Sequence, residues 1–225
     1  MPRKISPLLK KGNQWELVPK TIAEGLGTFA IVFFGCGAIR LGLSPLIVSI
    51  VFGLTVALMI YTLGHLSGAH FNPAVTLGFA AAKRFPRRHI VPYWLSQLTG
   101  AFLGVGLLSL LLPGKPSFGA VTSHLRPWQI LCWEALLTFC LMLVIITVAT
   151  HPKSPKALIA SSIGGMVLAG SMVGGPFTGA AMNPARFLAP AFAEGKWGWW
   201  WIYLFAAFLG ALLAAMVHEK IQLKD

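Results

Sequence analysis

Six long apolar stretches, almost free of charged residues, determine what this chain can fold into. Each comes close to the roughly 20 apolar residues with which a helix crosses a bilayer. Their approximate limits are 18–39, 46–64, 90–112, 129–150, 157–173 and 197–217. Only 11% of the residues are charged, against about 25% in soluble domains. The sequence therefore predicts an all-α membrane protein with six transmembrane helices.

Basic residues are distributed unevenly among the segments that join these stretches. With the N-terminus placed in the cytoplasm, thirteen of the 18 Lys and Arg residues lie inside and four lie outside, while Arg186 belongs to neither group. The inside residues are Arg3, Lys4, Lys10, Lys11, Lys20, Lys83, Arg84, Arg87, Arg88, Lys153, Lys156, Lys220 and Lys224; the outside residues are Arg40, Lys115, Arg126 and Lys196. The positive-inside rule therefore predicts that both termini are cytoplasmic. The net charge of +12 favours the anionic inner leaflet of a cell (inner) membrane as a partner, not nucleic acid.

The two halves of the chain repeat each other. Three echoes keep their order at displacements of 110, 111 and 106: EGLGTF (24–29) with EALLTF (134–139), GAHFNPA (68–74) with GAAMNPA (179–185), and AFLG (101–104) with AFLG (207–210). Constant displacement of this kind indicates duplication. Each repeat (about 18–112 and 129–217) carries three spans, so the second enters the membrane from the opposite face. We expect one channel domain over 1–225, an inverted 3+3 repeat with its functional site near the midplane.

An Asn-Pro-Ala motif occurs once in each repeat, before an apolar run that is too short to span. Asn is a favoured N-cap and Pro a favoured first helical residue. Each motif therefore predicts the start of a re-entrant half-helix, and the inverted repeat brings the two N-termini together. Helix N-termini carry about half a positive charge each, so the meeting point repels cations. The motif residues are Asn72, Pro73, Ala74, Asn183, Pro184 and Ala185.

Segments 23–29, 64–76 and 179–186 closely resemble the major intrinsic protein family, which contains aquaporins and glycerol facilitators. The resemblance covers about 18–217, and the motif context is most similar to bacterial and nodulin-like members. It implies a six-helix fold with two half-helices, four pores in a homotetramer, and passive flux of water and small uncharged solutes without a cofactor. It also implies that His70 shapes a ladder of carbonyl groups beside the first motif.

Arg186 follows the second motif directly. A charge at this depth costs about 3 kcal/mol on insertion scales, so a functional role is expected. By resemblance Arg186 belongs to the family's outer constriction, whose other members here are Phe52, Ser171 and Ala180. Strict water channels carry a histidine where this chain has Ser171, and glycerol facilitators carry a second aromatic residue. The resemblance therefore implies a permissive pore for water, glycerol and neutral metalloid hydroxides.

Glu24 and Glu134 are the acidic residues inside the spans. One interpretation is a proton relay, although the spans offer no chain of further titratable groups. The favoured interpretation is that each carboxylate accepts N–H groups from the re-entrant loop of its own repeat and supports that loop. The three cysteines lie inside spans and are expected to be packing residues, with no metal site.

Inverted repeats with broken helices also occur in coupled secondary transporters, which are the main alternative class. Coupling would need a carboxylate or an ion site at the midplane, where the two positive helix ends disfavour a cation. A membrane enzyme would need a nucleophile with its base or a metal cluster at depth, and the sequence shows no such catalytic group. A structural or adhesive member of the family is a further alternative.

Overall fold

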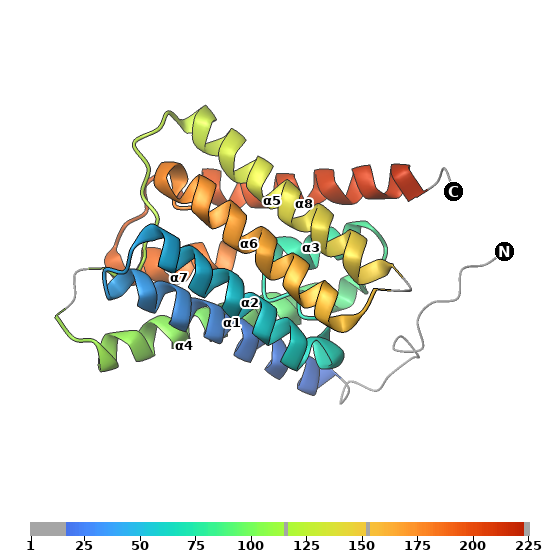
Figure 1. Cartoon of the computed structure of the whole chain (residues 1–225), viewed down its shortest axis with the longest axis horizontal. Helices are drawn as coiled ribbons and strands as arrows, with labels where there is room; N and C mark the ends of the chain where they lie inside the picture. Colours follow the sequence, from blue (N-terminus) through green and yellow to red (C-terminus); the bar gives the residue numbers. More distant parts are fainter. Residues whose placement is uncertain (1–16, 115–116, 152–153, 223–225) are drawn as a thin grey trace.

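The described part of the chain is built from helices and the segments that connect them. The computed structural model describes residues 17–114, 117–151 and 154–222, and its ribbon is shown in Figure 1. Six helices in these ranges are long and apolar enough to cross a membrane. They are α1 (Leu17–Arg40), α2 (Pro45–Ser67), α4 (Ile90–Leu111), α5 (Pro127–Thr150), α6 (Lys156–Thr178) and α8 (Trp200–Gln222). No strand occurs in the same ranges, so the predicted all-α membrane fold class is confirmed.

Two shorter helices complete the set, α3 (Pro73–Ala81) and α7 (Pro184–Glu194), with a 3-10 turn η3 (Arg87–His89) before α4. They have nine and eleven residues, which is too short to span a bilayer. In Figure 1, α3 and α7 lie toward opposite ends of the bundle, among the long helices. The start of α1 and the end of α8 lie at the same end, as an even number of spans requires.

Helices α2 and α6 continue past the limits expected from the sequence, which were residues 64 and 173. Each ends at a left-handed glycine, Gly68 with φ +89° and Gly179 with φ +77°. The amide of each glycine donates to the carbonyl four residues earlier, at Gly64 and Gly175. The glycine-rich stretches before these caps stay helical because helical hydrogen bonding satisfies the backbone inside lipid. Helix α8 begins at residue 200, after a turn at 198–199.

Glycines allow the long helices to cross at close range within each repeat. A Cβ atom on Gly100 of α4 would lie 2.0 Å from the Gly25 carbonyl oxygen of α1. In the second repeat, a Cβ atom on Gly210 of α8 would lie 2.3 Å from the Ala135 carbonyl oxygen of α5. Small residues at such crossings permit the backbone approach that drives helix association in membranes.

A third crossing joins the two repeats. A Cβ atom on Gly53 of α2 would lie 2.6 Å from the carbonyl oxygen of Gly164, and one on Gly164 of α6 would lie 2.4 Å from the carbonyl oxygen of Gly53. The contact is therefore reciprocal, as expected for residues beside a pseudo-twofold axis between the repeats.

Large apolar side chains cover the outside of the helix bundle. They project from several of the long helices and would contact lipid. The most exposed include Ile22, Leu54, Leu95, Leu103, Leu110, Leu136 and Ile221. This apolar exterior, together with six spanning helices, makes the protein an integral membrane protein.

The Gly100 crossing gives a direct stability test. Gly100→Ala should lower the melting temperature of detergent-solubilised protein because its Cβ would overlap the α1 backbone. Gly106→Ala in the same helix is the matched control, since a Cβ there meets nothing within 4 Å, and should leave the temperature unchanged or raise it slightly. Equal melting temperatures for the two variants would contradict this account of the crossing.

Candidate functional site

Each Asn-Pro-Ala motif begins a half-helix through the same hydrogen bond. The Asn72 side-chain oxygen accepts from the amide of Ala74 at 2.9 Å. The Asn183 oxygen accepts from the amide of Ala185 at 2.9 Å and from that of Arg186 at 3.4 Å. Pro73 and Pro184 follow the asparagines as the first helical residues. The caps leave both side-chain amide groups free to point away from their own helices.

The two asparagine amides bind across the boundary between the repeats. Nδ2 of Asn72 donates to the Met182 carbonyl at 2.8 Å, and Nδ2 of Asn183 donates to the Phe71 carbonyl at 2.9 Å. The acceptor in each case is the residue directly before the other asparagine. These reciprocal bonds hold the N-termini of α3 and α7 together. One N–H of each amide remains for a molecule in the pore.

The loops before the two half-helices share an unusual backbone. Ala69 and Phe71 have φ of +53° and +50°, and their counterparts Ala180 and Met182 have +44° and +50°. Left-handed conformations of residues other than glycine cost about 1–3 kcal/mol each and persist only where the surroundings hold them. Residues of both loops, among them Ala69, Phe71, Ala180 and Met182, line the cavity described below.

Glu24 of α1 holds the first loop. Its Oε1 accepts from the amide of His70 at 2.9 Å, and its Oε2 accepts from that of Phe71 at 2.6 Å. Gln97 of α4 also donates to Oε2, at 2.8 Å. The carboxylate is fully buried, so these donors replace the water that a charged group would otherwise need.

Glu134 of α5 holds the second loop in the same way. Its Oε1 accepts from the amide of Ala181 at 3.0 Å, and its Oε2 accepts from that of Met182 at 2.9 Å. The Thr178 hydroxyl donates to Oε1 at 2.7 Å. Neither this carboxylate nor that of Glu24 is among the groups that line the cavity described below.

Two tyrosines that no sequence motif marks support the ends of α2 and α6. The Tyr93 hydroxyl donates to the Ser67 carbonyl at 2.9 Å, and the Tyr203 hydroxyl donates to the Thr178 carbonyl at 2.9 Å. The tyrosines are displaced by 110 residues, as Glu24 and Glu134 are. That shared displacement was the signal that could have identified them.

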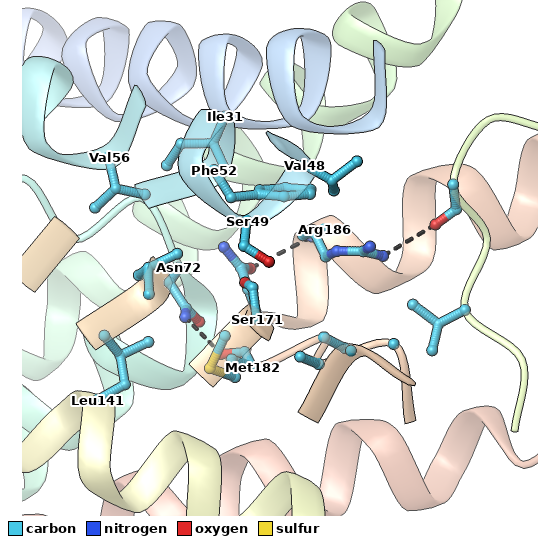
Figure 2. Close-up of a pocket in the computed structure, with 18 of the residues that line it drawn as sticks. Ile31, Val48, Ser49, Phe52, Val56, Asn72, Leu141, Ser171, Met182 and Arg186 are labelled. Carbon is cyan, nitrogen blue, oxygen red and sulfur yellow. Dashed lines mark hydrogen bonds between the residues drawn. The ribbon is translucent and has the colours of Figure 1, made fainter. Parts of the chain in front are cut away.

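A cavity of about 420 Å³ lies between the repeats. Its lining combines residues expected at the motifs and the constriction with apolar residues of the long helices. The expected residues that line it are Phe52, His70, Asn72, Ser171, Ala180, Asn183 and Arg186. The apolar residues include Ile31, Val48, Val56, Leu141, Ile145, Ile163 and Val167. Figure 2 shows polar and apolar residues of this lining, among them Asn72, Ser171 and Arg186 with Ile31, Val56 and Leu141.

His70 lies at the wall of this cavity, and its ring is held from behind. Its Nδ1 lies 3.1 Å from the Thr76 hydroxyl. The ring stacks on Phe79, with centroids 4.8 Å apart, and meets the edge of Phe85 at 4.8 Å. The imidazole therefore has little freedom to leave the loop that carries it.

Arg186 extends from the first turn of α7 toward the segment that joins α4 and α5 (Figure 2). Its Nη1 donates to the Gly119 carbonyl at 3.0 Å. Its guanidinium carbon lies 5.3 Å from the centre of the Phe52 ring. The side chain is buried, and Ser171 and Ala180 line the same cavity. Gly119 had no expected role, because no repeat or motif in the sequence marks it.

The arrangement suits neutral molecules that form hydrogen bonds. The two half-helix N-termini each contribute about half a positive charge at one spot, and Arg186 adds a full charge. A neutral solute can exchange its hydrogen bonds with water for bonds to the loop carbonyls and the asparagine amides. Within residues 17–114, 117–151 and 154–222, no three His, Cys, Asp or Glu side chains gather to hold a metal.

Residues 11–218 match the family model described as major intrinsic protein. The chain belongs to this family. Nodulin-26 from Glycine max is 38% identical, over 99% of this chain and 86% of the relative. Aquaporin NIP1-1 from Oryza sativa subsp. japonica is 39% identical, over 91% of this chain and 75% of the relative. The X-ray structure of the aquaglyceroporin from Plasmodium falciparum superposes with a TM-score of 0.84 at 28% identity, covering 91% of this chain and 96% of that one.

Membership of the major intrinsic protein family makes the chain a transmembrane channel for water and small solutes, and not an enzyme. The family resemblance and the channel function expected from the sequence are both confirmed. The alternative of a coupled secondary transporter is not supported, because the matched family consists of channels.

Whether the charge of Arg186 excludes ions can be tested by measuring ion leak in a variant that lacks it. Unit charges about 4 Å apart repel by about 4 kcal/mol at an effective dielectric constant near 20, a factor of roughly a thousand in rate. Arg186→Val should therefore raise proton or monovalent-cation leak by up to that factor, with glycerol flux retained or increased. Leak is measured by voltage-clamped current and by dye reporting of vesicle pH.

Arg126→Val is the matched control, because Arg126 is an exposed arginine before α5. It should leave ion leak and glycerol flux as in the unmodified protein. Unchanged ion tightness in Arg186→Val, at equal protein loading, would place the barrier elsewhere in the pore.

Proposed function

We propose that this channel is a permissive pore for water, glycerol-sized neutral solutes and neutral metalloid hydroxides, and that it excludes protons and ions. The observation that carries the proposal is the composition of the constriction. Phe52 supplies one aromatic side chain, while Ser171 and Ala180 leave the remaining wall small. A hydroxymethyl group in place of an imidazole widens the opening and removes one ring donor.

The proposed roles of the polar groups follow from their contacts. The free amide hydrogens of Asn72 and Asn183 donate to a passing solute, while the loop carbonyls accept from it. A water that accepts from both amides turns its own hydrogens away, which interrupts the chain of hydrogen bonds along which a proton would move. Glu24 and Glu134 support the loops, and His70 shapes the carbonyl ladder of the first.

The names of the relatives support the proposed solutes. The similar structure from Plasmodium falciparum is that of an aquaglyceroporin, and the matched plant proteins are nodulin-26 and an aquaporin. Both plant relatives are more than 35% identical to this chain. This similarity agrees with the nodulin-like motif context on which the inclusion of neutral metalloid hydroxides rests.

We also propose a membrane, an orientation and an oligomeric state for the channel. The chain forms one channel domain over 1–225 in a cell (inner) membrane, with both termini cytoplasmic and anionic lipid at the inner leaflet. The charge asymmetry of the connecting segments supports this orientation. Seven of the basic residues that define this charge asymmetry lie outside the described residues. They are Arg3, Lys4, Lys10, Lys11, Lys115, Lys153 and Lys224. Family resemblance supports a homotetramer with one pore in each subunit.

A swelling assay in proteoliposomes tests the width of the constriction. Water, glycerol, urea and a neutral metalloid acid are compared in the unmodified protein and in Ser171→His. The larger side chain should reduce glycerol flux by roughly tenfold, which corresponds to about 1.4 kcal/mol, and reduce water flux much less.

Ser161→His is the control, because Ser161 is exposed on the same helix and is not among the residues that line the cavity. It should leave both fluxes unchanged. An equal loss of water and glycerol flux in Ser171→His, or no loss of glycerol flux, would mean that residue 171 does not set the width.

Orientation is tested by labelling with a membrane-impermeant thiol reagent, in a chain whose three cysteines are replaced by alanine. Arg88→Cys lies at the end where α4 begins, and Arg126→Cys lies at the opposite end, before α5; both positions are exposed. In intact cells Arg126→Cys should react and Arg88→Cys should react only after lysis. The reverse pattern would overturn the proposed orientation.

A further inference from the structure

The segment between α4 and α5 is fastened to the end of α7 by a carboxylate. Oε1 of Glu194 accepts from the amide of Phe118 at 2.6 Å, from that of Ala120 at 2.9 Å and from the Ser117 hydroxyl at 3.2 Å. Only 5% of the Glu194 side chain is exposed. Its second oxygen pairs with the Lys196 ammonium at 2.8 Å.

Arg40 at the end of α1 fastens the same segment from another helix. Its Nε and Nη2 donate to the Leu112 carbonyl at 3.0 and 2.5 Å, and its Nη1 donates to the Ser117 carbonyl at 3.0 Å. The guanidinium also lies 3.9 Å from the centre of the Phe118 ring. Arg40 is buried, and the fixed fork of its donors suits binding to two carbonyls at once.

Gly119 lies between these two anchors and faces the pore. Its φ is +82°, and a Cβ there would lie 3.0 Å from Cδ1 of Ile39 and 3.3 Å from Cys36 of α1. Its carbonyl accepts from Arg186, while the amides on either side of it, those of Phe118 and Ala120, donate to Glu194. The Gly119 carbonyl and the Ala120 amide belong to one planar peptide group, so the bond from Ala120 to Glu194 fixes the direction of this carbonyl.

We propose that Glu194 and Arg40 are positioning residues of the constriction, which fix segment 117–120 so that the Gly119 carbonyl holds Arg186 against the wall of the pore. The inference rests on the proposed function, since it concerns the width of the same opening. Neither residue lines the cavity, so each acts through the Gly119 carbonyl. If the segment loosens, the Arg186 guanidinium loses this acceptor and can swing across the opening toward Phe52, which hinders glycerol more than water.

The carboxylate of Glu194 makes this anchor dependent on pH. Lys196 pairs with this carboxylate directly, while Arg40 and Arg186 bind carbonyls of the same segment, those of Ser117 and Gly119. Burial raises the pKa of Glu194, but the bonds from Lys196 and from the Ala120 and Phe118 amides outweigh it, so the pKa lies below its ordinary value. The carboxylate is therefore charged at neutral pH, and the anchor weakens as the pH falls through that lowered pKa.

The test measures the ratio of glycerol to water permeability in proteoliposomes equilibrated at a series of pH values. In the unmodified protein the ratio should be constant near neutral pH and fall in acid. Glu194→Gln imitates the protonated carboxyl and should give a low ratio at every pH. The expected fall is roughly twofold to tenfold, which corresponds to the net loss of one hydrogen bond.

Two further variants separate positioning from general stability. Lys196→Gln keeps the backbone bonds but removes the ion pair that lowers the pKa of Glu194, so the acid midpoint should move to higher pH. Arg40→Lys keeps the charge but loses the fork of donors, and should lower the ratio at every pH. Glu219→Gln, which neutralises a carboxylate paired with Arg84 near the end of α8, is the matched control and should behave as the unmodified protein.

The outcomes distinguish this inference from the proposed function. Glycerol flux no greater than in protein-free vesicles would overturn the proposed function itself. With glycerol flux present, an unchanged or increased ratio in Glu194→Gln would overturn only the positioning role. If Glu194→Gln does not fold, the acid midpoint of Lys196→Gln tests the same role independently, and an unshifted midpoint would also overturn the inference.

Discussion

The whole architecture depends on how irregular backbone is satisfied in the middle of a membrane. Two loops leave the helical conformation at a depth where lipid offers no hydrogen bonds. Glu24 and Glu134 each bind two consecutive amides of a loop, and the asparagines of the two motifs bind the last carbonyl of the opposite loop. Without these hydrogen bonds nothing would offset the cost of the left-handed residues, and the N-termini of the two half-helices would not be held together.

The polarity of the pore follows from this solution. The two glutamates bind amides of the loops without lining the cavity themselves, while the loop residues that carry these amides do line it. Much of the rest of the lining comes from apolar residues of the long helices, such as Ile31, Leu141 and Val167. A solute therefore meets hydrogen-bonding groups at the motifs and only van der Waals contact along these apolar residues. Such a passage replaces part of the hydrogen bonding that a neutral solute has with water. A cation in the same passage is repelled by the two positive helix ends and by the charge of Arg186.

Hydropathy, duplication and the Asn-Pro helix starts were enough to derive the six spans, the half-helices and the facing of Asn72 and Asn183. The ends of α2 and α6 were not derivable in this way, because a glycine-rich stretch fits both a helix and a loop until its cap is known. Gly119, Arg40 and Glu194 carry no motif and have no echo in the other repeat. Their contacts around segment 117–120 join parts of the chain more than 60 residues apart, and only tertiary structure brings such residues together.

The reciprocal contact of Gly53 and Gly164 has the geometry of an isologous interface, in which two identical half-length chains would use the same patch. In such a dimer any substitution would be present twice, once on each side of the midplane. Joining the halves in one polypeptide removes that restriction. The residue after the motif is Val75 in one repeat and Arg186 in the other. Covalent fusion thus allows a two-fold scaffold to carry a single, one-sided filter.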